Sequence, residues 1–194
     1  MSSTENLAQG PLIVIDTNVV LDLWLFDNPD VAPLRLALES RCLNWIACER
    51  MFGELPRVLT YAHLQAKLGV HLNNAITPLT KALEMMGSQP QGTVQLPFMS
   101  HDQVAQGIVA CMQHWAQSCE TAPRCRYQCK DPDDQVFVDL AAQHCATLFS
   151  KDKAVLKLKN RLARLGAGVV SAKDSGAWLK ALGLDGRKRY ANTH

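Results

Sequence analysis

One short run near the start of the chain constrains the fold more than any other feature. Residues 12–15 (LIVI) are continuously apolar and rich in β-branched side chains, and they end in the polar triplet Asp16-Thr17-Asn18. An apolar stretch, residues 19–26, follows directly. An uninterrupted apolar run of this length predicts a strand that is buried on both faces, as in a parallel sheet. A strand that gives way to polar residues and then to a helix is the first half of a βα unit.

The rest of the chain alternates in the same way. We predict further strands at residues 44–48, 146–150 and 169–171. The predicted helices cover residues 33–38, 51–59, 63–86 with a break at Pro78, 101–119, 136–141, 154–165 and 175–182, with a loop or strand at 87–97. Pro56 is expected in the first turn of its helix or at a kink. This order predicts a three-layer α/β/α domain with a mainly parallel central sheet. The domain covers residues 11–182, between a disordered lead-in at 1–10 and a polar tail at 183–194.

Length and composition fit a single globular domain. The chain has 194 residues, of which 47% are hydrophobic and 20% charged, and this balance is typical of folded domains rather than disordered ones. No apolar run approaches the roughly 20 residues that span a bilayer, and the first residues lack the basic and apolar regions of a secretion signal. We therefore expect a cytoplasmic location and no membrane partner. The net charge of +2 is too small to identify a nucleic-acid binder by itself.

Four acids fall where a parallel sheet gathers its ligands. Asp16 ends the first predicted strand, Asp152 follows the strand that ends at Ser150, Asp134 opens a helix, and Glu54 lies on an early helix. The carboxyl ends of parallel strands meet at one edge. Four acids brought together there would repel one another unless a cation neutralised them, and all-oxygen ligation suits Mg²⁺ or Mn²⁺. Such a cation activates water and holds a phosphate oxygen, which predicts phosphodiester hydrolysis.

Each acid also has a purely structural interpretation. Asp16 and Asp152 are suited to cap the helices that follow them. Asp134 would stabilise a helix N-terminus through the helix dipole, and Glu54 would be a solvated helix residue. Spacing alone leaves both interpretations open.

Three segments in a fixed order resemble a known family. They are IVIDTNV at 13–19, CKDPDD at 129–134 followed by Phe137 and Ala141, and Ser150-Lys151-Asp152. Together they resemble the PIN-domain family and, within it, a bacterial branch of toxins from toxin–antitoxin pairs. The resemblance covers residues 11–182. It implies an Mg²⁺- or Mn²⁺-dependent endoribonuclease whose metal-binding, catalytic acids are Asp16, Glu54, Asp134 and Asp152.

The resemblance also implies supporting residues and partners. Asn18 would be a polar companion of Asp16, Ser150 the hydroxyl before the last acid, and Asp131 a peripheral acid. RNA, a neutralising antitoxin and a second copy of the chain are the implied partners. The family commonly has a small residue where this chain has Lys151. A lysine there could contact a phosphate or partly replace a cation, which keeps open a catalytically weak module that binds RNA or protein.

A phosphatase of the haloacid-dehalogenase type is the other enzyme class that begins with a hydrophobic strand and an aspartate. Its chemistry needs a second aspartate two residues after the first. Asn18 occupies that position here, so this interpretation is disfavoured.

Basic residues suggest where RNA would bind. Lys157, Arg161 and Arg164 recur at helical spacing within the predicted helix 154–165, so they would share one face. With Lys151 they form the predicted RNA-binding set. An ordinary amphipathic surface helix explains the same pattern. The basic tail at 187–190 is either a second contact or a disordered end.

The seven cysteines form an odd number in a chain without an evident export signal, which predicts reduced thiols. Cys111, Cys119, Cys125 and Cys129 crowd around His114, but they lack the close pairs typical of zinc sites. The pattern therefore favours ordinary thiols and gives this segment no role. The four tryptophans lie in apolar patterns and are expected in the core.

Overall fold

The computed structural model describes residues 10–61, 64, 76–87 and 101–184. The predicted lead-in and tail fall almost wholly outside these ranges, as do the basic segment 187–190, the loop 87–97 after its first residue, and most of the helix predicted before residue 76. Within the described part, no helix combines the length and the apolar character needed to cross a membrane.

The centre of the molecule is a five-stranded, wholly parallel sheet. Its strands lie in the order β3-β2-β1-β4-β5. They are β1 (Leu12–Ile15), β2 (Asn44–Cys48), β3 (Ala116–Cys119), β4 (Thr147–Ser150) and β5 (Gly168–Ser171). The middle strand β1 pairs Ile13 with Trp45 on one side and with Thr147 on the other. Because all strands point the same way, their carboxyl ends form a single edge.

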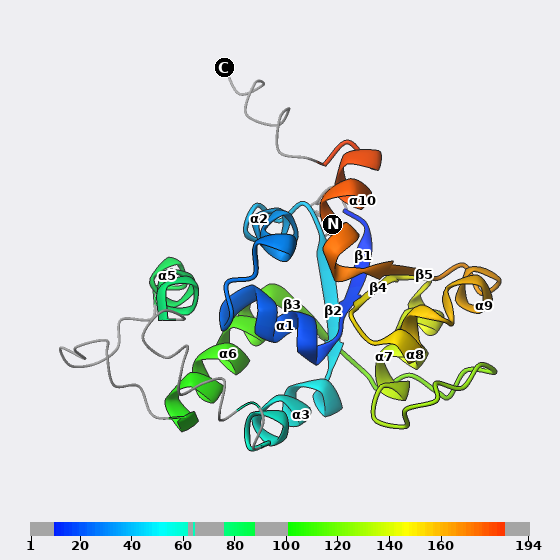
Figure 1. Cartoon of the computed structure of the whole chain (residues 1–194), viewed down its shortest axis with the longest axis horizontal. Helices are drawn as coiled ribbons and strands as arrows, with labels where there is room; N and C mark the ends of the chain where they lie inside the picture. Colours follow the sequence, from blue (N-terminus) through cyan, green and yellow to red (C-terminus); the bar gives the residue numbers. More distant parts are fainter. Residues whose placement is uncertain (1–9, 62–63, 65–75, 88–100, 185–194) are drawn as a thin grey trace, which may run out of the picture.

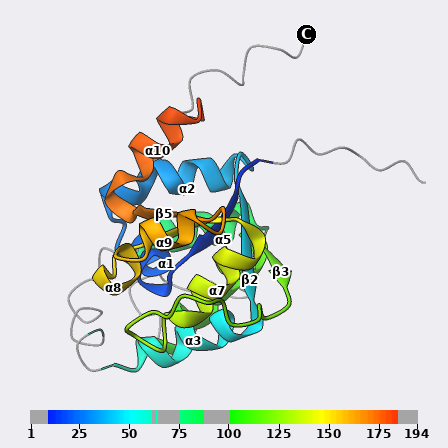
Figure 2. The same cartoon turned by 90° about the vertical axis from the view of Figure 1, so that its right-hand side faces the viewer.

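Helices cover both faces of this sheet, which confirms the predicted three-layer α/β/α architecture. The helices α1, α5 and α6 lie on one side of β1 and β2, and α7 lies on the other (Figure 1). The helices α8, α9 and α10 gather beside β5 (Figure 2). The helical elements are α1 (Thr17–Trp24), η1 (Pro29–Val31), α2 (Ala32–Glu39), α3 (Glu49–Leu59), α5 (Ile76–Met85), α6 (His101–Trp115), α7 (Gln135–His144), α8 (Lys153–Leu156), α9 (Lys159–Ala163), η2 (Ala172–Asp174) and α10 (Ser175–Ala181).

The tryptophans lie in the core, as predicted. Trp24 of α1 and Trp45 of β2 are fully buried and stack with their ring centroids 5.7 Å apart. Trp115 is buried at the end of α6. Trp178 of α10 is partly buried and meets Phe149 edge-on at 5.1 Å. These large rings fix the helices against the sheet, since each buries a large apolar area.

The prediction of one helix over residues 101–119 was wrong. Helix α6 ends at Trp115, and residues 116–119 form the edge strand β3, which pairs along its whole length with β2. The sequence AQSC has no β-branched or aromatic residue to indicate a strand. Pairing with a neighbouring strand therefore overrides the weak local preference.

Two further helix predictions need correction. The predicted helix 154–165 is two short helices, α8 and α9, separated at Lys157 and Leu158. The Leu158 amide bonds the Val155 carbonyl three residues back, so the chain tightens there. Pro56 lies in the interior of α3 rather than in its first turn. Helix α3 continues to Leu59 without the hydrogen bond that a proline nitrogen cannot donate.

Candidate active site

Asp16 is held at the centre of the sheet's carboxyl edge. It follows β1 directly, and its backbone N–H bonds the Phe149 carbonyl of β4 at 3.0 Å. Its carboxylate accepts a hydrogen bond from the backbone N–H of Asn18 at 3.2 Å and one from the Ser150 hydroxyl at 2.6 Å. The residue is only 2% exposed. Burial raises the pKa of Asp16, and the bonds from Ser150 and Asn18 oppose that rise.

Ser150 connects Asp16 to Asp152. The Ser150 hydroxyl is fully buried, donates to Asp16, and accepts the backbone N–H of Asp152 at 2.9 Å. The Asp152 carboxylate in turn caps α8 by accepting the amides of Ala154 and Val155. The capping role considered for Asp152 is therefore real, and it fixes the carboxylate beside the end of β4. One hydroxyl thus sets the positions of two predicted site acids.

Glu54 reaches the same edge from α3. Its carboxylate accepts a hydrogen bond from the Thr17 hydroxyl at 3.0 Å. Thr17 is buried and follows Asp16 directly. Burial raises the pKa of Glu54, with a further rise from the charge of Asp16. Thr17 is a site residue that sequence reasoning did not single out, and its place inside the Asp16-Thr17-Asn18 triplet was the signal available.

Asp134 brings the acids into a single electrostatic field. It begins α7 without making a side-chain capping bond. Burial is the largest cause that raises its pKa, and with the charges of Asp16, Asp152, Asp131 and Glu54, in that order, it brings the pKa to about 7. Charges act this strongly only over short distances. The four predicted acids therefore lie near one another, and Asp131 lies at their margin as an exposed residue.

The chemistry of this donor set suits a hard divalent cation. The pKa values of Asp16, Glu54 and Asp134 are all raised, so a cation among them would favour their ionised forms. Their oxygens are the donors that Mg²⁺ and Mn²⁺ prefer. Across the described ranges, however, no three acidic, histidine or cysteine side chains are already arranged to hold an ion. Coordination would require some of these side chains to turn.

Lys151 forms an ion pair with an acid outside the predicted site. Its ammonium lies 2.6 Å from a carboxylate oxygen of Asp22 on α1. The Asp22 side chain is 5% exposed and also accepts a hydrogen bond from Asn28. Lys151 therefore neutralises a buried carboxylate, and its charge also lowers the pKa of Asp16. Its predicted contact with RNA would have to compete with this ion pair.

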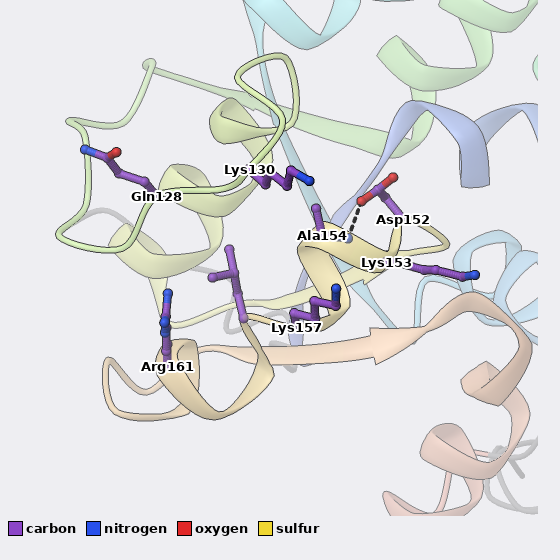
Figure 3. A pocket seen from close by; sticks show the side chains of 8 residues that line it. Gln128, Lys130, Asp152, Lys153, Ala154, Lys157 and Arg161 are labelled. Atoms are coloured by element: carbon purple, nitrogen blue, oxygen red, sulfur yellow. Dashed lines mark hydrogen bonds between the residues drawn. The ribbon is translucent and has the colours of Figure 1, made fainter.

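Two grooves border the acids. The larger, which we call the Lys157 groove, has a volume of about 430 Å³ and is drawn in Figure 3. It is lined by Gln128, Lys130, Asp152, Lys153, Ala154, Lys157, Leu158 and Arg161. The smaller, which we call the Arg57 groove, has a volume of about 250 Å³ and is lined by Arg50, Gly53, Glu54, Arg57, Asp133 and Val136. Of the predicted RNA-binding residues, Lys157 and Arg161 line the larger groove and Arg164 does not.

A buried polar pair on α7, Gln135 and Asp139, was missed from the sequence. The Gln135 side chain accepts the Cys129 amide at 2.6 Å and donates to the Tyr127 carbonyl at 3.1 Å and to Asp139 at 2.7 Å. Asp139 also accepts the Cys125 amide at 2.9 Å. We call this pair the α7 brace. It fastens residues 125–129 to the helix, so the cysteine-rich segment has a structural role through its backbone. A polar pair four residues apart on an otherwise apolar helix was its signal in the sequence.

One comparison with known proteins identifies a family. A family model described as PIN domain matches residues 12–154. The match runs from the start of β1 into α8 and includes all four predicted acids. A search of curated protein sequences found no match.

Proposed function

Because the chain belongs to the PIN-domain family, we propose that it is an Mg²⁺- or Mn²⁺-dependent endoribonuclease whose site is Asp16, Glu54, Asp134 and Asp152. The observation that supports the proposal is how these acids are held at the carboxyl edge of the sheet, where Ser150 bonds both Asp16 and the Asp152 amide and Thr17 bonds Glu54. Burial and the charges of neighbouring carboxylates raise the pKa of Asp134 there to about 7. An acid that only stabilises a helix start gains nothing from four other carboxylates nearby, because their charges oppose its ionisation. A cation-binding site explains why they are gathered there.

The chain's own residues would divide the work. Asp16 and Asp152 are held by hydrogen bonds, so they would present fixed oxygens. Glu54 and Asp134 come from helices and would complete the donor set. When bound, the cation would supply a water of lowered pKa and hold a phosphate oxygen. Ser150 and Thr17 would keep Asp16 and Glu54 oriented, as outer partners of metal-binding carboxylates do.

The finer parts of the proposal rest on the sequence resemblance. They are RNA as the substrate, a cytoplasmic location, and a role as the toxin of a toxin–antitoxin pair, with an antitoxin and a second copy as partners. The structural support for RNA is the set of basic side chains in the Lys157 groove, because Asp152 lies in the same groove. A catalytically weak binding module is the competing outcome.

The test is cleavage of an end-labelled single-stranded RNA by the purified protein with Mg²⁺, with Mn²⁺ and with a chelator. Wild type should cut only with metal, whereas Asp16→Asn and Asp134→Asn should reduce cleavage to background. Asp102→Asn is the matched control, since Asp102 is an exposed acid on α6 and should leave the rate unchanged. Equal rates in wild type and in the two site variants would exclude the assigned site. RNA binding without metal-dependent cleavage would favour the binding module.

A further inference from the structure

The cations of the Lys157 groove differ from other basic groups near the acids. Lys130, Lys157 and Arg161 are exposed, and among the ion pairs of the described residues none involves these three. By contrast, Lys151 is bound to Asp22, and Arg57 lies 3.5 Å from Asp133. The Lys157 groove therefore concentrates unneutralised positive charge beside the site, which favours an anionic ligand.

These cations come from separate elements, and two of them extend toward the helix that Asp152 caps. Lys130 precedes α7, Lys157 follows α8, and Arg161 lies on α9. Figure 3 shows the Lys130 and Lys157 side chains extending toward the first turn of α8, which Asp152 caps, whereas Lys153 points away from them. A ligand held by Lys130 and Lys157 would therefore lie next to one of the proposed site acids.

We propose that the Lys157 groove binds backbone phosphates of the single-stranded RNA substrate on the Asp152 side of the cleavage site. This inference rests on the proposed function and adds which part of the protein binds the substrate RNA. The Arg57 groove, on the Glu54 side, is a poorer phosphate site because Glu54 and Asp133 line it and Asp133 pairs with Arg57. The RNA backbone is therefore bound mainly on the Asp152 side of the cleavage site.

The lining also indicates what part of the RNA is recognised. None of the eight residues that line the groove is aromatic, so it offers no ring on which a base could stack. Its four cations and one amide side chain suit phosphate and sugar oxygens. Contacts of this kind position a strand without reading its sequence. The groove should thus contribute affinity but little base preference.

One wall of the groove is held in place by the α7 brace. Gln128 and Lys130 lie within and just after the segment that Gln135 and Asp139 fasten to α7. The other wall is formed by α8 and α9, which pack against β5. Both walls are therefore tied to the folded core, so their backbone needs no ordering when RNA binds and only the side chains lose freedom.

The decisive comparison uses two double variants in the C-terminal part of the described chain. Lys157→Glu/Arg161→Glu reverses two cations of the groove. Lys159→Glu/Lys180→Glu reverses two exposed cations that do not line it. Both pairs change the net charge equally. Binding of a fluorescent oligouridine to each otherwise wild-type protein is measured in chelator, so that no cleavage occurs, over a series of KCl concentrations.

The groove pair should bind about tenfold or more weakly, and the control pair within about twofold of wild type. Each lost phosphate contact lowers the salt dependence, log Kd against log[KCl], by about 0.7 for single strands. The groove pair should therefore lose about 1.4, and the control pair almost nothing. Equal losses in both pairs would show a diffuse charge effect and overturn the proposal, as would unchanged affinity in the groove pair. Lys157→Gln/Arg161→Gln should show the same direction, and circular dichroism checks that each variant is folded.

A kinetic arm separates this inference from the proposed function. With Mg²⁺, the groove pair should raise KM while kcat stays within about twofold, because neither residue touches the acids' own hydrogen bonds. If wild type does not cleave RNA but the groove pair still weakens binding, the nuclease proposal fails and the groove assignment stands. If wild type cleaves and the groove pair changes neither Kd nor KM, the groove assignment fails alone.

Discussion

The acids of the site come from two regions that stabilise them differently. Asp16 and Asp152 follow the central strands β1 and β4, and each accepts two hydrogen bonds from nearby groups. Glu54 and Asp134 come from α3 and α7. Glu54 accepts one bond from Thr17, and Asp134 makes no capping bond. The strand-borne pair is thus positioned by the sheet, whereas the helix-borne pair depends on what lies between the helices.

The difference indicates which of these acids are held in place by the protein alone. Hydrogen bonds to a carboxylate stabilise its charged form, so the strand-borne pair is fixed before any ion binds. Burial still raises the pKa of Asp16, but its bonds oppose that rise, whereas Asp134 has no capping bond to oppose the rise of its pKa to about 7. A bound cation would stabilise the helix-borne acids most. We expect the strand-borne region to control the stability of the fold, and the helix-borne region to control the response to pH and metal.

Removing the hydroxyl that joins the strand-borne acids should have the largest effect. Ser150→Ala would leave a buried oxygen of Asp16 and the Asp152 amide without their partner. We expect about 1–3 kcal/mol lower stability, the usual cost of unsatisfied buried groups, and about 10- to 100-fold lower metal-dependent activity. Urea unfolding and the RNA cleavage assay measure the two effects. Ser40→Ala is the control, because the Ser40 hydroxyl bonds only its own helix end and Cys42. Unchanged stability in Ser150→Ala would show that the bridge does not anchor the site.

The helix-borne region should make the metal-free protein less stable as pH rises. The folded pKa of Asp134, about 7, exceeds its ordinary value of 3.8. The unfolded chain therefore loses this proton first, and the stabilising contribution present at low pH is lost as pH rises through about 7. Because Asp134 is only partly buried, solvent screening reduces the effect to about 1 kcal/mol.

Thermal unfolding in chelator at pH 5.5 and pH 8 measures this effect. Asp134→Asn should reduce the difference between the Tm at pH 5.5 and the Tm at pH 8, and Asp102→Asn should not. Mg²⁺ should recover stability at pH 8 in wild type but much less in Asp134→Asn. A wild-type protein that is more stable at pH 8 than at pH 5.5 in chelator, with Asp134→Asn showing the same difference, would contradict the assigned role of Asp134.

Removing the Thr17 hydroxyl, which bonds the helix-borne acid Glu54, should have the smallest effect on stability and activity. Thr17→Val keeps the shape of the side chain and removes the hydroxyl that bonds Glu54. The Glu54 carboxylate is partly exposed, so water can replace the lost donor. We expect a stability loss of about 0.5–1 kcal/mol and an activity loss of only a few fold. The same unfolding and cleavage assays apply. A loss as large as that of Ser150→Ala would remove the distinction between the two regions.

The central part of the fold and of the site could be predicted because its signals are local. The run before Asp16 has to be a buried strand, Asp16 and Asp152 follow strands, and Asp134 precedes a helix. Glu54, inside α3, had no such local signal. The edge strand β3 could not be predicted, because Ala116 to Cys119 carry no strand signal and are ordered by pairing with β2. The break between α8 and α9 was hidden as well, since the spacing of Lys157, Arg161 and Arg164 fits one helix.

Long-range partners were the other limit of the sequence. Lys151 was noticed as unusual, but its partner Asp22 lies on α1, over a hundred residues earlier in the chain. The same holds for Ser150 and Asp16, which are 134 positions apart. Only the expectation that the carboxyl ends of parallel strands meet at one edge suggested that they are close. The α7 brace is local, yet its partners are backbone amides of a segment with no recognisable pattern.

The α7 brace has a consequence for where a bound strand would be cut. Asp134 immediately precedes α7, and the brace holds the segment before Lys130 on the same helix. The proposed catalytic acid and part of one wall of the Lys157 groove are thus both attached to α7. Helix α7 would therefore fix the distance between a phosphate bound in the groove and the bond that is cleaved. An oligonucleotide that is too short to reach from one to the other should be cut slowly, whatever its sequence.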